Sequence, residues 1–260
     1  MKFTISILLV LIVFTYTGFS QPRSYIGLSI GPAIPVGEFA KTDNTDDKAG
    51  LARLGAWANL EYVHQFRGSD FGFVASLRAR WNPINSQAAL GSLKEANPNF
   101  QWQANKASWQ SAALMAGVYR DFHFIKKLSV KTGIQLGAAE VVLPAFNVTG
   151  VGNSLAYPGK QDALFATSNK RYSTTLSGAF QAEVSGRISK RFYWLAHGDF
   201  WFTGPTFKNV KETIIYAQGL VVPGVLTPGN ASSISINEFT QNYTQPANSI
   251  NLAIGIGMGL

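Results

Sequence analysis

Residues 250–260 read INLAIGIGMGL, and this stretch decides the fold. A large apolar side chain stands at every even position, whereas the odd positions hold Asn, Ala or Gly. Strict alternation of this kind is typical of a β-strand with one apolar face. The stretch carries no charge, and its length suits the roughly 9–11 residues that a tilted strand needs to cross a bilayer. We therefore expect its even-numbered side chains to face lipid.

The same period of two recurs upstream. It is found in residues 24–32, 53–66, 71–82, 128–138, 176–188 and 192–202. Residues 108–124 also have the composition of a strand, but the phase of their alternation is ambiguous. We favour Leu114, Ala116 and Val118 for the apolar face of this fourth strand. With the C-terminal stretch, the sequence predicts eight strands.

The connections between these strands alternate strictly in length. Short connections lie near 67–70, 125–127 and 189–191, and long ones span 37–50, 83–107, 141–171 and 205–247. Tight turns would then gather at one end of an up-and-down sheet and long loops at the other, which is the anatomy of a transmembrane β-barrel. The last long loop contains apolar runs. These predict either a hairpin above the membrane or two further strands in a ten-stranded barrel.

The composition favours a membrane barrel over the soluble alternative, a lipocalin-type barrel with an apolar interior. Only 14% of the residues are charged, against about 25% in soluble domains. The polar face of the strands is rich in Gly, Ser and Ala, which suits a narrow lumen better than a solvated surface. The prediction is an all-β protein, an eight-stranded antiparallel up-and-down transmembrane β-barrel over residues 21–260.

Residues 1–20 have the features of a secretory signal peptide. Lys2 precedes an apolar run over 3–16, and the small residues Gly18 and Ser20 precede the predicted cut. The alternative, a membrane anchor, would need about 20 apolar residues. The formal charge of +8 is scattered rather than concentrated in a basic arm, so we expect no nucleic-acid partner.

The opposite face of the strands carries charges of both signs, which we place in the lumen. The predicted lumen network consists of Arg53, Glu61, Arg78, Arg80, Lys131, Glu183, Arg187, His197 and Asp199. Because the interior of an eight-stranded barrel is just wide enough for side chains to fill, we expect these groups to pair and to plug it. The alternative is an ion or solute path. His197 and Asp199 could also form a general-base pair, but a polar core is the simpler interpretation.

Two segments carry a resemblance to a known family. YIGLSIGPAIPVGEF (25–39) and SINLAIGIGMGL (249–260) resemble the first and last strands of the small outer-membrane β-barrels common in Bacteroidota-type bacteria, which are similar to the OmpA and OmpX transmembrane domains. The resemblance implies a bacterial outer-membrane location. It also implies that the barrel-assembly machinery recognises the last strand through Ile250, Leu252, Ile254, Ile256, Met258 and Leu260.

From these patterns we expect a monomer in contact with outer-membrane lipid, with a non-catalytic role in membrane structure or in surface interaction. The long loops would meet an unknown extracellular ligand. A narrow porin-like channel or transport component is the alternative, and a lipid-modifying enzyme is the third. No cofactor is expected, and no metal either, because the three His residues are dispersed and Cys is absent.

Overall fold

The structure is a computed structural model that describes residues 24–43, 46, 48–125, 128–189, 191–220 and 230–260. The predicted signal peptide at 1–20 lies outside the described residues and stays a prediction. Among the described residues, no helix is long and apolar enough to cross a membrane.

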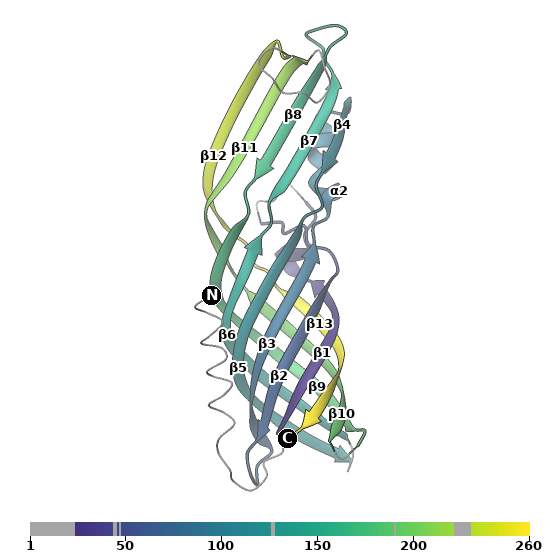
Figure 1. The fold of residues 1–260 in the computed structure, drawn as a ribbon, viewed down its shortest axis with the longest axis vertical. Coiled ribbons are helices and arrows are strands. Elements are labelled where there is room, and N and C mark those ends of the chain that lie inside the picture. The colour runs from purple at the N-terminus through teal and green to yellow at the C-terminus, as the bar shows by residue number, and fades with distance from the viewer. Residues whose placement is uncertain (1–23, 44–45, 47, 126–127, 190, 221–229) are drawn as a thin grey trace.

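Eight antiparallel strands close into a barrel, as the sequence predicts (Figure 1). Around the barrel the order is β1-β13-β10-β9-β6-β5-β3-β2. The first and last strands pair directly, with Ile26 opposite Met258 and Ile34 opposite Ile250, so no edge is left open. The strands are β1 (Ser24–Pro35), β2 (Gly55–Gln65), β3 (Phe71–Pro83), β5 (Ser108–Ile125), β6 (Leu128–Leu143), β9 (Arg171–Arg187), β10 (Phe192–Thr203) and β13 (Ser249–Gly259).

Side chains alternate between the two faces in the predicted phase. Ile254 on β13 is 76% exposed on the outside, whereas Asn251 on the same strand is fully buried inside. The ambiguous fourth strand follows the favoured phase, because Leu114 and Val118 are exposed and Met115 is buried. The outward-facing large side chains form an apolar belt, which includes Leu28, Ile30, Leu60, Leu77, Leu114, Ile134, Leu136, Phe180, Leu252, Ile254 and Ile256.

Aromatic residues mark both ends of this apolar belt. On β3, Phe71 and Trp81 both point outward and are about half exposed. With a rise of about 3.3 Å per residue and a tilt of roughly 35–45°, the ten steps between them span about 25 Å along the barrel axis. That is the height of the lipid-facing band of outer-membrane barrels.

A second sheet of five strands stands above the barrel, in the order β12-β11-β8-β7-β4 (Figure 1). It is built from the long loops: β4 (Phe100–Ala104), β7 (Phe146–Asn153), β8 (Gln161–Ser168), β11 (Thr206–Leu220) and β12 (Ser233–Thr244). The predicted hairpin in the last loop is therefore confirmed as β11–β12, and the ten-stranded barrel is wrong. The sequence did not predict that β4, β7 and β8 join this hairpin.

Prolines separate the barrel from this protruding sheet. Pro144 lies between β6 and β7, Pro205 between β10 and β11, and Pro246 between β12 and β13. Proline has no backbone N–H and cannot donate to a ladder. Each proline therefore interrupts strand pairing where a chain segment passes from the barrel to the protruding sheet.

Two loops add short helices, one at the mouth of the barrel and two beside the protruding sheet. The first loop contains the 3-10 helix η1 (Gly37–Ala40), and the second contains α2 (Ser86–Ala89) and α3 (Gly91–Ala96). In α2 the side chain of Asn85 accepts a hydrogen bond from the backbone N–H of Ala88, which caps the helix N-terminus. Helix η1 carries Phe39, whose side chain is fully buried.

Candidate functional site

The lumen of the barrel is the candidate site. Aromatic side chains close the end that lies next to the protruding sheet, which we call the outer end. Phe39 from η1 packs edge-on against Trp109 of β5, with ring centroids 5.7 Å apart. Trp109 also packs against Phe207 and donates its indole N–H to the carbonyl of Gly50 at 2.8 Å. Trp201 of β10 is fully buried in the same cluster. We call the four rings of Phe39, Trp109, Trp201 and Phe207 the outer plug.

Arg80 lies beneath the outer plug, and none of its hydrogen-bond partners within the described part of the chain is a carboxylate. Its guanidinium donates to Ser111, to the carbonyl of Ala247 and to Ser249. The same group lies 4.6 Å from the ring centroid of Trp201 and 5.0 Å from that of Phe39. These cation–π contacts stabilise a buried charge by a route other than an ion pair.

The middle of the lumen contains a fully buried ion pair. Arg78 Nη1 on β3 lies 2.6 Å from Asp199 Oδ2 on β10, and both side chains are 0% exposed. Asp199 also accepts a hydrogen bond from Asn251 Nδ2 at 2.7 Å. His197 Nε2 lies 3.4 Å from Asp199 Oδ2. Three strands therefore converge on one carboxylate, which fixes its position.

Below this pair, two carboxylates share one tyrosine. The hydroxyl of Tyr25 on β1 lies 2.6 Å from Glu183 Oε1 and 3.1 Å from Glu61 Oε1. Lys131 Nζ on β6 forms an ion pair with Glu183 at 2.9 Å and donates to Ser185 at 3.2 Å. Buried charges are tolerated when they are paired and hydrogen-bonded, and this cluster meets that condition for Glu183 and Lys131.

The inner end of the lumen holds a second cluster of buried apolar side chains. Tyr25, Val63, Val74, Tyr119 and Leu195 pack together there, and Tyr193 packs against them. The lumen therefore consists of an aromatic outer plug, a charged middle layer and an apolar inner layer.

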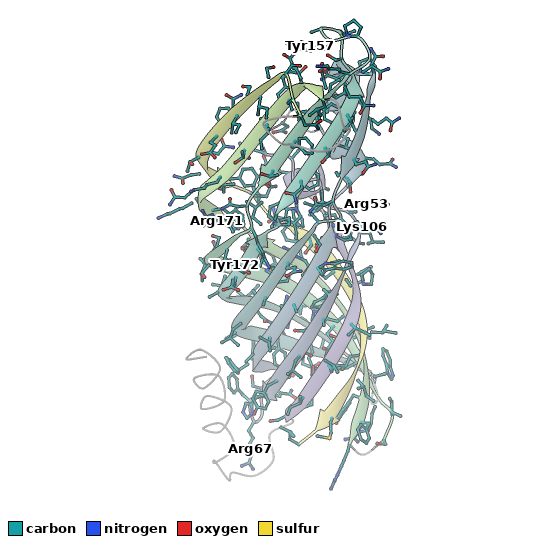
Figure 2. All side chains as sticks on the ribbon, turned by 45° about the horizontal axis from the view of Figure 1, so that its top comes forward. Arg53, Arg67, Lys106, Tyr157, Arg171 and Tyr172 are labelled. Carbon is teal, nitrogen blue, oxygen red and sulfur yellow. The ribbon has the colours of Figure 1, made fainter. Side chains whose placement is uncertain are left out.

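The structure brings together most of the predicted network but not all of it. Glu61, Arg78, Arg80, Lys131, Glu183, His197 and Asp199 are all buried inside the barrel. The placement of Arg53 and Arg187 in the lumen is wrong, because both side chains are exposed. Arg53 precedes β2, which begins only at Gly55, and it lies at the junction with the protruding sheet (Figure 2). Arg187 is the last residue of β9, where it lies over the ring of Tyr193.

The predicted lumen network, which consists of charged residues and His197, does not include several other buried polar residues of the lumen. They are Tyr25, Asn59, Ser76, Ser111, Asp121, Gln135, Ser185, Ser249 and Asn251. Most are neutral side chains that complete hydrogen bonds to the charged groups. Their odd or even position on a strand already indicated the inward face for Asn59 and Asn251. Asp121 could have been found in the same way, because it lies at an odd position on the strand whose even-numbered Leu114 and Val118 face outward. In the structure it lies directly opposite Lys131.

Comparisons with known proteins give similarity of structure only. No protein-family profile and no curated protein sequence matches the chain. The crystal structure of a major outer membrane protein from Thermus thermophilus is 10% identical, with a TM-score of 0.42 over 91% of this chain and 99% of that chain. Ail, the attachment invasion locus protein of Yersinia pestis, in complex with the heparin analogue sucrose octasulfate, is 12% identical, with a TM-score of 0.43 over 93% of this chain and 100% of that chain.

Proposed function

We propose that the chain is an integral outer-membrane barrel that serves as a rigid base for a protein-binding sheet at the cell surface. The apolar belt supports the membrane location, because its large side chains point outward all around the barrel. Arg53, Lys106, Arg171 and Tyr172 lie where the barrel meets the protruding sheet, and Arg67 lies at the opposite end (Figure 2). Basic and aromatic residues at both margins suit the two membrane–water interfaces.

The free edge of β12 is the observation that carries the proposal. Within the described part of the chain, this strand pairs with β11 on one side only, and 11 of its 12 residues are exposed. Its exposed side chains include Ile234, Ile236 and Phe239, and Glu238 is its only charged residue. Proteins usually protect an edge with Lys, Pro, a bulge or a short strand. The opposite edge, β4, is short, with five residues, whereas β12 is long and unprotected.

An unprotected edge of this kind suits β-strand addition. A partner protein would pair an extended segment with the backbone of β12, and the apolar side chains would give the pairing its specificity. The filled lumen favours this role over the alternative of a channel, because aromatic rings and paired charges occupy the path. The barrel then acts as an anchor, and the binding surface lies above the membrane.

Site-specific photo-crosslinking in intact producing cells tests the interaction. A photoreactive residue at position 236 is expected to give a discrete adduct with one protein. The same residue at Leu176, which points outward from the barrel, is the matched control and should not give that adduct. Ile236→Lys together with Phe239→Lys should reduce the affinity of the identified partner at least tenfold, because charged side chains disfavour edge pairing. No adduct from β12, or one unaffected by the lysines, would contradict the proposal.

Conductance in planar bilayers tests the closed lumen. The purified barrel is expected to leave the bilayer at its background conductance, because the outer plug and the charged layer fill the lumen. Steps that change in size in a Glu61→Gln variant would show that ions pass the middle layer and would favour the channel. Steps of equal size in both proteins would come from contaminating porins and would leave the expected closed state standing.

A further inference from the structure

We propose that Glu61, Glu183 and His197 form a binding site for a divalent transition-metal ion such as Zn²⁺ in the middle of the lumen. The three side chains come from β2, β9 and β10, and all are buried. Each offers one ligand atom, and these atoms lie within 4.8 Å of one another. That spacing allows a single ion to contact all three with little rearrangement.

The histidine is oriented as a metal-binding histidine would be. Its Nε2 faces the Asp199 carboxylate at 3.4 Å, which places an N–H at this nitrogen. The other nitrogen, Nδ1, carries a lone pair when the ring is neutral. It is buried, makes no hydrogen bond within the described part of the chain and lies 3.9 Å from Glu183 Oε2. A nitrogen that faces a carboxylate in this way is joined to it by a shared proton or by a metal ion, and a metal ion takes the place of the proton.

The surrounding residues hold the histidine in this orientation. Asp199 accepts hydrogen bonds from Arg78 at 2.6 Å and from Asn251 at 2.7 Å, so it cannot easily turn away from the ring. A carboxylate that accepts the second N–H of the imidazole is the usual support of a metal-ligating histidine. Glu61 is held in turn by Tyr25 and by Asn59 Nδ2 at 3.2 Å.

The charge around the histidine also favours a cation. The buried carboxylates of this group are Glu61, Glu183 and Asp199. The cations paired with them are Arg78 and Lys131, whereas Arg80 is held by the outer plug and by hydroxyl and carbonyl groups. The three carboxylates therefore outnumber these two cations by one, and the remaining positive charge is supplied either by a proton on His197 or by a bound metal ion. A bound cation offsets the extra negative charge in a place where an unbalanced charge is costly.

The ligand chemistry indicates the class of metal. One imidazole nitrogen and two carboxylates suit Zn²⁺ and its neighbours, which accept mixed nitrogen and oxygen ligands, with a water molecule in the fourth position. Spacing along the chain could not have predicted the site, because its ligands lie on three strands and no two of them form a short motif. We infer a structural role, in which the ion ties β2, β9 and β10 together.

Cobalt provides a visible probe for this site. The full-length barrel, refolded in detergent micelles with Co²⁺ and then freed of unbound metal, is expected to retain about one ion per barrel, with the ligand-field absorption of a low-coordinate site. Added Zn²⁺ should displace the signal. Glu61→Gln and His197→Gln should each lower the affinity at least tenfold, and Asp199→Asn should lower it about 10–100-fold by releasing the ring.

Glu140→Gln is the matched control, because Glu140 is exposed on the outer face of β6. It should bind Co²⁺ like the unaltered protein, and heat-modifiable gel mobility should show that each variant has folded. X-ray absorption of the Co²⁺-loaded unaltered protein needs no variant and should detect one imidazole ligand. The proposal would be overturned by a folded barrel that retains no Co²⁺, by equal retention in all variants, or by an all-oxygen coordination sphere.

Discussion

Replacement of Asp199 by alanine is expected to lower the free energy of unfolding by about 3–5 kcal/mol, the range seen when one partner of a buried ion pair is removed. Arg78 would keep its charge in a place where its side chain is 0% exposed. Asn251 and His197 would lose the same acceptor. The loss should be measured by urea unfolding of the barrel in lipid vesicles, followed by tryptophan fluorescence.

Two further variants make this first test specific. Glu238→Ala removes an exposed carboxylate from β12 and should change the free energy of unfolding by no more than about 0.5 kcal/mol. Arg78→Met combined with Asp199→Leu removes both charges and should be more stable than Asp199→Ala alone, because no unpaired charge is left buried. If Asp199→Ala were as stable as Glu238→Ala, the buried ion pair would not contribute to holding the barrel together.

Replacement of Ile254 by arginine is expected to cost about 2–4 kcal/mol, the penalty for a cation at the midplane of an outer-membrane barrel. Ile254 is 76% exposed and lies midway along β13, opposite Ile30 of β1 and Ala196 of β10. In a soluble protein, a change at so exposed a position would have little effect. The penalty therefore arises from lipid and not from packing within the protein.

Ile236→Arg on β12 is the matched control for the second test. Ile236 is 59% exposed, but it belongs to the protruding sheet, which we place in water. The free energy of unfolding in vesicles should then change by no more than about 0.5 kcal/mol, against several times that for Ile254→Arg. Equal effects of the two arginines would contradict the proposed position of the membrane around the apolar belt.

The barrel could be predicted because one physical constraint acts on all its strands. A strand with a lipid-like exterior and a crowded interior must alternate, and this alternation is visible without any knowledge of which strands pair. No such constraint acts on the strands of the protruding sheet, so their sequences need not alternate. Strand β12 is exposed on both faces, and β4 is only five residues long, so neither carries a strong period. Their pairing depends on the barrel strands that bring them together.

The residues of the lumen could likewise be predicted only in part. Position on a strand correctly placed Glu61, Glu183 and Asp199 inside, but it also placed Arg53 and Arg187 there, because alternation does not show where a strand begins or ends. Alternation also gives a face and not a distance. The register between distant strands decides which side chains meet. It brings Tyr25 against two glutamates and turns one nitrogen of His197 toward Asp199.

The charged middle layer has a consequence for the order in which the molecule assembles. Tyr25 meets Glu183 across 158 positions of the chain, and Arg80 meets Ser249 across 169. Contacts of this range form late, since the entropy of closing a long loop is lost before any pairing compensates for it. The carboxylates thus stay hydrated in the open sheet and lose water only when β1 joins β13. Closure of the barrel between β1 and β13 is then expected to be the slow step of folding. The hydrogen bonds and ion pairs of the charged layer form after the barrel has closed and hold it closed.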